Sequence, residues 1–105
     1  MQANHNPQIQ AGWELFLNLV VDTESADDLA ALCDFLLTPE ECESLGLRVS
    51  LIRELLDARL TQREISKELG VSIAKITRGS NALKRITPKL RERLLCVLCD
   101  SSEKK

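Results

Sequence analysis

Aromatic residues are scarce in this 105-residue chain, which has one Trp, two Phe and no Tyr. A compact monomeric core would therefore depend almost wholly on Leu, Ile and Val, so extra burial through self-association is expected. Glycine and proline are also few, with four and three residues. Together with an apolar content of 44%, these shortages indicate a single, mostly helical domain.

Long hydrophobic runs are missing as well. No apolar run approaches the roughly 20 residues that a membrane helix needs, and the start of the chain, MQANHNPQIQ, lacks the basic and apolar regions of a signal peptide. We therefore expect a cytoplasmic protein with no membrane partner. The only histidine, His5, lies in this polar start, and there is no Gly-rich phosphate loop. These absences argue against an enzyme.

The four cysteines predict neither a disulfide framework nor a metal site. Only Cys96 and Cys99 have metal-like spacing, and no second CxxC pair or nearby histidine completes a zinc site. In a cytoplasmic chain with a helical apolar pattern, Cys33 and Cys96 are expected to be small buried hydrophobes.

Charge is distributed unevenly along the chain, although the formal net charge is only −2. Residues 1–58 carry a net charge of −9, residues 59–91 carry +7, and the last 14 residues are balanced. A polyanion would be attracted by the middle segment and repelled by the first, so the asymmetry would orient the molecule on it. A solvated charged face is the alternative interpretation.

The chain divides into a flexible arm at residues 1–8, one helical domain at 9–100 and a tail at 101–105. Helices are expected from Ile9 to about Val21, with Trp13 in a core or an interface, and from about Asp27. Thr38, Pro39 and Glu41 form a capping box that starts a helix to about Ala58. Its predicted buried residues are Leu45, Val49, Ile52, Leu55 and Leu56. Thr87 and Pro88 start the last helix.

Residues 62–85 have the pattern of a helix-turn-helix. Thr61 and Glu64 form a second capping box, Gly70 suits the left-handed turn position and Ser72 can cap the second helix. The two helices are expected to bury Ile65, Leu69, Val71 and Ile76 against each other.

The outer face of the second helix then presents polar donors suited to phosphates and base edges. An ordinary polar face on a packed hairpin, or a basic face that meets an acidic protein, is the alternative.

Two runs, LTPEECESLGLRVSLIRELL and LTQREISKELGVSIAKITRGSNALK, resemble the bacterial tryptophan repressor family over about Trp13 to Leu98. The resemblance implies an all-α fold, a six-helix intertwined homodimer with a helix-turn-helix. It also implies a tryptophan-activated transcriptional repressor of tryptophan biosynthesis and transport genes, whose partners are double-stranded operator DNA and the corepressor L-tryptophan.

The resemblance implies a tryptophan site between the long helix and the recognition helix. Arg48 and Arg78 match the family's two arginines, whose guanidinium planes can flank an indole while one pairs with the carboxylate. Gly79 leaves the space that the ligand needs. The remaining site residues are Leu37 and Thr38, which receive the ligand's ammonium group across the dimer, Phe35, where the family more often has Leu, and Ala82.

Besides Phe35, Ala82 and Lys75 depart from the family's pattern. At Ala82 the best-known members have a serine that helps to hold the ammonium group, and losing that hydroxyl would cost about 0.5–1.5 kcal/mol. Lys75 stands where Thr is usual, which adds a charge and could alter operator preference. Because of Ala82 and Phe35, the alternative is a repressor of the same fold that does not respond to tryptophan, or that responds to another indole or amino acid.

For DNA, the resemblance implies that the recognition helix enters the major groove, with half-sites about one helical turn apart. Base contacts that are largely water-mediated are expected. Nine residues are candidates for DNA contact: Gln62, Arg63, Ser72, Asn81 and Lys84 toward phosphates, and Ile73, Ala74, Lys75 and Thr77 toward the bases.

Overall fold

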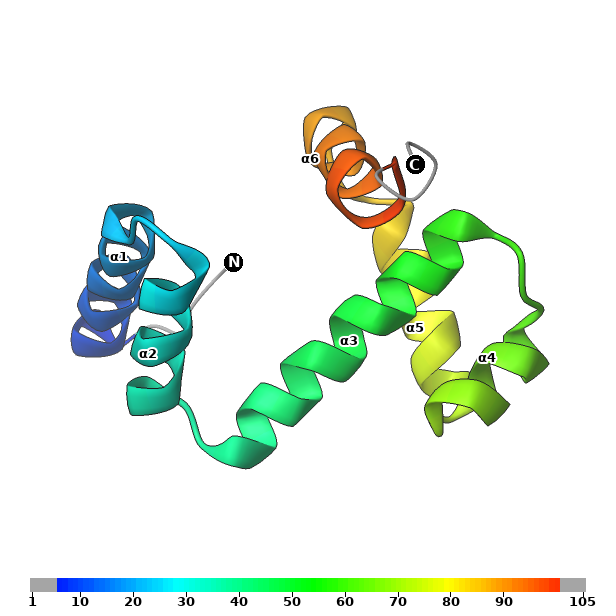
Figure 1. Cartoon of the computed structure of the whole chain (residues 1–105), viewed down its shortest axis with the longest axis horizontal. Coiled ribbons are helices and arrows are strands. Elements are labelled where there is room, and N and C mark those ends of the chain that lie inside the picture. The colour runs from blue at the N-terminus through cyan, green and yellow to red at the C-terminus, as the bar shows by residue number, and fades with distance from the viewer. Residues whose placement is uncertain (1–5, 101–105) are drawn as a thin grey trace. The chain divides into compact units, whose positions relative to one another are not determined.

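The computed structural model describes residues 6–100, and within that range the chain is helical with no strand. The all-α prediction is therefore confirmed for these residues, and the predicted tail at 101–105 lies outside them. The elements in chain order are α1 (Pro7–Asp22), α2 (Ala26–Leu36), α3 (Pro39–Asp57), α4 (Gln62–Leu69), α5 (Ile73–Leu83), α6 (Pro88–Leu94) and the π-helix η1 (Leu95–Asp100) (Figure 1).

Helix starts follow the predicted capping residues. At the start of α3, the Thr38 N–H donates to Glu41 Oε1 (2.9 Å) and the Glu41 N–H donates to Thr38 Oγ1 (3.1 Å). Thr61 and Glu64 make the same reciprocal pair at α4, with distances of 2.8 and 3.1 Å. Both predicted capping boxes are confirmed, because each satisfies two backbone donors that a helix start leaves open.

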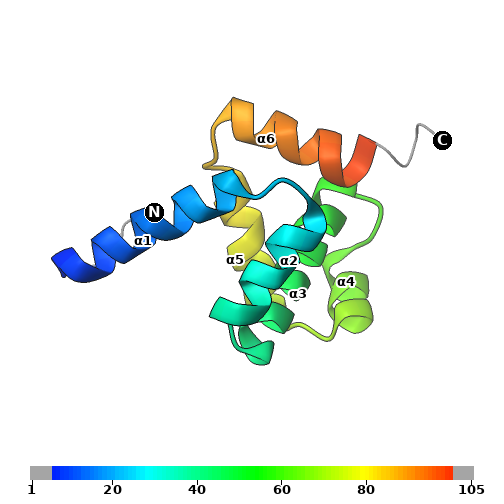
Figure 2. The same ribbon diagram turned by 60° about the vertical axis from the view of Figure 1, so that its left-hand side comes forward.

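Two helix ends differ from the prediction. The first helix begins at Pro7 instead of Ile9, because Asn6 caps it and Pro7 occupies the first helical position. Residues 1–5 of the predicted arm lie outside the described residues. The last helix changes from α6 into the π-helix η1 at Leu95, and Figure 2 shows the two as one continuous rod.

The chain divides into two compact units, Met1–Cys42 and Glu43–Lys105. The first holds α1, α2 and the start of α3, and the second holds the rest of α3 with α4, α5, α6 and η1. The prediction of one repressor domain over residues 9–100 stays a prediction.

The core of the second unit joins α3 to the α4–α5 pair. Its buried residues are Leu51, Ile65, Val71 and Ile76, which are at most 6% exposed, and Leu69 packs against them in part. Three of these residues, together with Leu69, were expected from the pattern of residues 62–85. The turn residue Gly70 has the predicted left-handed backbone, with φ of 68°.

Burial on α3 was predicted incorrectly. Leu45 and Val49 are 48% and 44% exposed, while Ile52, Leu55 and Leu56 are only half-buried. Leu51, which the pattern did not single out, is the buried residue, because it faces α5 across Gly79. Within the second unit, the apolar stripe on α3 is wider than the neighbouring helices cover.

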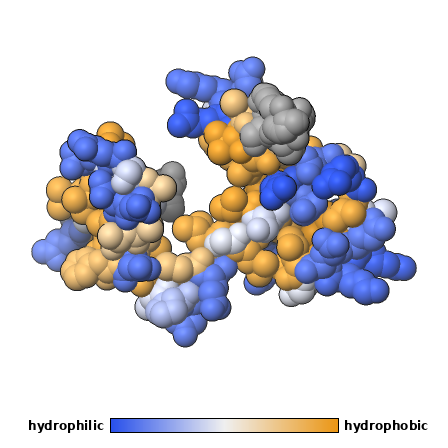
Figure 3. Space-filling view, in the orientation of Figure 1, coloured by the Kyte–Doolittle hydropathy of each residue, from blue (hydrophilic) through white to orange (hydrophobic). Residues whose placement is uncertain are grey.

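The cysteine and tryptophan positions show the same shortage of cover. Cys33 is half-buried and Cys96 is exposed, so the prediction of a buried Cys96 is wrong. Trp13 is half-buried, with its ring centroid 5.6 Å from that of Phe16, and no residue of α1 is buried. Figure 3 shows hydrophobic surface over α1 and α2 and, in the second unit, over α3 and beneath α6.

None of the helices within residues 6–100 is long and apolar enough to cross a membrane. The same residues contain no group of three or more His, Cys, Asp or Glu side chains placed to hold a metal ion.

Candidate ligand groove and nucleic-acid interface

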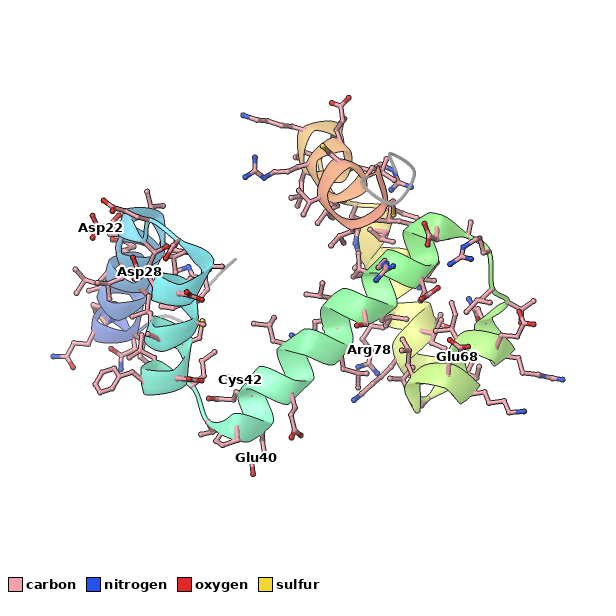
Figure 4. The ribbon with its side chains drawn as sticks, viewed as in Figure 1. Asp22, Asp28, Glu40, Cys42, Glu68 and Arg78 are labelled. Carbon is pink, nitrogen blue, oxygen red and sulfur yellow. The ribbon has the colours of Figure 1, made fainter. Side chains whose placement is uncertain are left out.

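A groove of about 370 Å³ lies between α3 and α5 in the second unit. This volume is within the range of small-molecule sites, and the lining is mostly apolar with a few polar groups, as such sites usually are. The α3 residues that line the groove are Ser44, Leu47, Arg48, Leu51 and Ile52, and the others are Val71, Lys75, Arg78, Gly79 and Ala82. In Figure 4, Arg78 extends from α5 alongside α3.

Gly79 determines how closely α5 approaches α3. A Cβ built at Gly79 would lie 3.3 Å from Leu51 Cδ2 and 3.5 Å from Leu55 Cδ1. The first distance is tighter than an ordinary van der Waals contact, so a side chain here would press on Leu51, which also lines the groove. The glycine thus has a packing role in addition to the space that it leaves in the groove.

Four of the seven predicted tryptophan-site residues line this one groove: Arg48 from α3, and Arg78, Gly79 and Ala82 from α5. Phe35, Leu37 and Thr38 belong to the first unit, on α2 and at its junction with α3. Phe35 is 84% exposed, so nothing in its own unit covers its ring. The expected role of these three residues across a dimer stays a prediction.

Three cations surround the groove, because Lys75 lines it together with Arg48 and Arg78, and no acidic residue does. All three side chains are exposed. From the sequence, Lys75 was expected only on the DNA-facing side. Helical spacing could have placed Lys75 at the groove as well, since residues three, four and seven apart share one helical face. Arg78, Gly79 and Ala82 stand at these distances from Lys75.

Several other lining residues were missed from the sequence. Ser44, Leu47 and Ile52 lie near Arg48 on α3, while Leu51 and Val71 are also part of the buried core. One turn of helix separates Ser44 and Leu51 from Arg48 in either direction, so helical spacing alone could have placed them near that arginine.

All nine residues predicted to contact DNA are exposed. Gln62 and Arg63 form the first turn of α4, and Ser72 caps α5 by accepting a hydrogen bond from the Lys75 N–H (3.1 Å). The side chain of Ile73, next to this cap, is 47% exposed although it is apolar. Thr77 and Asn81 lie further along α5, and Lys84 is the residue that caps its end. The exposed helix start leaves backbone N–H groups open to an anion such as a phosphate.

A second groove, of about 270 Å³, lies where α3 and α5 meet α6 and η1. It shares Arg48, Ile52 and Ala82 with the first groove, and every other lining residue is apolar: Leu45, Val49, Leu83, Ile86, Leu94 and Leu98. Leu45 and Val49 of α3 therefore border an apolar depression, which the described residues of the second unit leave open.

Comparison with known proteins places these features in a family. Residues 11–97 match the family model of the Trp repressor protein. A Trp operon repressor homolog of Chlamydia trachomatis serovar D is 44% identical over 85 residues, which are 81% of this chain and 90% of the relative. A homolog from Vibrio parahaemolyticus is 39% identical over 90% of this chain and 91% of its own length. A third, from Vibrio cholerae, is 47% identical over 69% of this chain and 70% of its own.

The match covers both units of the chain, from α1 to η1, and includes every residue of the groove and of the exposed α4–α5 face. The family identified from the two sequence runs is thereby confirmed. The chain belongs to the Trp repressor protein family.

Proposed function

We propose that this chain is a tryptophan-activated transcriptional repressor, which binds the operator DNA of tryptophan biosynthesis and transport genes as a homodimer in the cytoplasm. The family match and the relatives' name, Trp operon repressor homolog, support this proposal. One further observation supports it: one face of the eleven-residue helix α5 lines the groove, and another face presents exposed polar residues.

The groove has the chemistry that an aromatic amino acid needs. Leu47, Leu51 and Ile52 provide an apolar surface for an indole ring, and Arg48 and Arg78 also line the groove. Guanidinium planes attract the face of an indole and also form paired hydrogen bonds with a carboxylate. L-tryptophan is therefore the ligand that we assign to this groove.

For DNA, α4 and α5 act as a helix-turn-helix, with α5 as the recognition helix in the major groove. Gln62, Arg63 and Lys84 contact phosphates, and the first turns of α5 face the bases. The net charge of +7 on residues 59–91 attracts the DNA backbone to this side of the molecule.

The ligand acts by binding one arrangement of the recognition helices better than the others. Tryptophan wedged between α3 and α5 stabilises the arrangement in which both recognition helices of the dimer reach successive major grooves. The coupling is reciprocal, so operator DNA must increase the affinity for tryptophan by the same factor.

DNA binding with and without L-tryptophan is the experiment that tests the proposal. Fluorescence anisotropy on operator-like DNA should show tighter binding with the ligand, and Arg63→Ala or Lys84→Ala should weaken binding and reduce the salt slope by about one. Arg53→Ala is the matched control, because Arg53 is an exposed arginine of α3 outside both surfaces. DNA binding that ignores both substitutions would contradict the helix-turn-helix assignment, and would favour a basic protein-interaction face.

Ala82 is the observation that favours a second candidate, a repressor of the same fold that does not respond to tryptophan. Ala82 lines the groove without offering a hydroxyl to the ligand's ammonium group. Calorimetric titration with L-tryptophan separates the two candidates, since absence of binding at millimolar ligand would exclude tryptophan.

Substitution of Ala82 by serine tests the same two candidates, because it adds the hydroxyl that Ala82 lacks. Ala82→Ser should tighten tryptophan binding about two- to tenfold, as expected for one added hydrogen bond of about 0.5–1.5 kcal/mol. Ala74→Ser, on the same helix but outside the groove, should leave the affinity unchanged. Equal affinities of Ala82→Ser and the original chain would show that the ammonium group does not lie near this position.

A further inference from the structure

Lys75 is a charged lining residue of the groove that the expected tryptophan site does not include. We propose that Lys75 is a specificity-determining residue of the ligand groove, where its ammonium group pairs with the ligand's carboxylate and selects aromatic carboxylates. This inference rests on the proposed function, because it concerns the same groove and refines the class of its ligand.

The helical position of Lys75 directs it toward the groove. Lys75, Arg78, Gly79 and Ala82 are separated by three, one and three residues, so they form one stripe along α5, and all four line the groove. The backbone N–H of Lys75 is bonded to the Ser72 side chain (3.1 Å), which fixes the start of the side chain in the first turn of the helix. Its long aliphatic part can then lie along the apolar lining while its ammonium group stays in water.

The charges around the groove are unbalanced. Arg48, Lys75 and Arg78 line it without any acidic residue, and the ion pair found among residues 6–100 joins Arg59 to Asp57 (3.5 Å), elsewhere in the fold. Like charges three residues apart on a helix repel each other, as Lys75 and Arg78 do. A bound carboxylate relieves this repulsion, so the groove favours a ligand with an anionic group.

The same charges disfavour a cationic group on the ligand. Ala82 contributes only a methyl group, and none of the residues that line the groove is a carboxylate that could neutralise an ammonium group. Within this unit, the carboxylate of the ligand is therefore the group that the lining recognises, and Lys75 supplies a third cation for it beside the two arginines.

This position has a consequence for DNA recognition. An ammonium group that pairs with the bound ligand is withdrawn from bases and phosphates, so Lys75 contributes less to operator contact in the liganded protein than its exposed place on α5 indicates. Whether Lys75 is free to contact DNA at the start of the recognition helix then depends on the charge of the bound ligand.

Isothermal titration calorimetry with two probes tests the proposal. L-tryptophan carries a carboxylate, whereas L-tryptophanamide has the same ring and ammonium group without it. Lys75→Met should weaken tryptophan binding about two- to fivefold and should leave tryptophanamide binding unchanged or tighter. Lys75→Arg keeps the charge and should retain most of the affinity for tryptophan.

Lys67→Met is the matched control, because Lys67 is an exposed lysine of α4 that does not line the groove and is not assigned to DNA contact. It removes the same net charge, so it measures the long-range electrostatic part of the effect, which should be small. Circular dichroism of each variant checks that its helix content is unchanged.

The possible failures are distinguishable. If the original chain binds tryptophan and Lys75→Met binds it equally well, or loses affinity for both probes to the same extent, the role of Lys75 is overturned and the proposed function stands. If the original chain binds neither probe, the tryptophan-responsive function and the inference that rests on it fail together.

Discussion

Gly70 and Ala58 are the two residues of the described chain with a positive φ, at 68° and 57°. Both directly follow a helix, α4 in the case of Gly70 and α3 in the case of Ala58. A left-handed residue at this position closes the last helical turn, as shown by the Gly70 N–H, which donates to the Ser66 carbonyl at 2.9 Å. Glycine adopts this conformation at no steric cost, whereas other residues are strained there by about 1–2 kcal/mol.

Gly70→Ala should lower the free energy of unfolding by about 1–2 kcal/mol, because the added Cβ is strained although no neighbouring atom lies within 4 Å of it. Urea denaturation at fixed protein concentration measures the change. Gly70→Asn is the control, since asparagine tolerates this region better and should cost less. Equal losses for both variants would mean that the backbone conformation is not the cause.

The structure changes the ionisation of Cys42. Partial burial raises the pKa of the Cys42 thiol, and the charges of Asp34, Cys33 and Glu41 act in the same direction. A raised pKa means that the folded chain holds this proton to a higher pH than the unfolded chain does. Folding stability from this group is therefore present at neutral pH and is lost as the pH rises from the unfolded pKa through the folded one.

Alkylation of Cys42 should consequently require a higher pH in the folded protein than in the chain unfolded in urea, because the thiolate is the reactive form. Peptide mass spectrometry after brief iodoacetamide treatment, at a series of pH values, gives the midpoint for each state. Midpoints that coincide, or a lower one for the folded protein, would contradict the raised pKa.

At the scale of elements, local signals were enough to locate the helices. The capping boxes at Thr38 and Thr61 involve residues three positions apart, so the sequence contains the whole interaction. Burial on α3 depends on which helices cover it, and helical spacing alone does not contain that information. Leu45 and Val49 were therefore predicted to be buried, although they are exposed in the second unit. In the groove, Arg48 and Arg78 were predicted from the family resemblance. Lys75 was predicted only to face the DNA, so its place in the groove was missed.

The α4–α5 pair packs around two fully buried side chains, Ile65 of α4 and Ile76 of α5. Ile76 is 0% exposed, so Ile76→Ala should lower the free energy of unfolding by about 2–5 kcal/mol through lost burial and the cavity left behind. Ile73→Ala, on the same helix, is the control: Ile73 is 47% exposed, and its truncation should change stability by less than about 0.5 kcal/mol. Urea denaturation of the two variants provides the comparison, and similar losses would show that the buried core is not where the structure places it.

At the scale of the whole molecule, exposed apolar side chains outnumber the buried ones. Phe35 and Val21 are 84% and 83% exposed, and the apolar groove beside Leu45 and Val49 is open. Large exposed apolar patches mark interaction sites in proteins, so we expect these side chains to be covered by self-association. The few aromatic residues of the sequence led to the same expectation of self-association.

The midpoint of thermal unfolding should therefore rise with protein concentration, because a dimer that dissociates on unfolding is stabilised by mass action. Calorimetric scans over a hundredfold range of concentration measure the shift, and sedimentation equilibrium gives the mass. A midpoint independent of concentration together with a monomeric mass would exclude the homodimer.

The two faces of α5 also have an evolutionary consequence. One helix of eleven residues both lines the groove and forms the exposed face, and Lys75 belongs to both surfaces. A substitution at Lys75 changes at once which ligand the groove accepts and what the helix offers to DNA. Relatives that acquire a new ligand are therefore expected to acquire new operators with it, and the response to the ligand and the choice of genes are inherited as one trait.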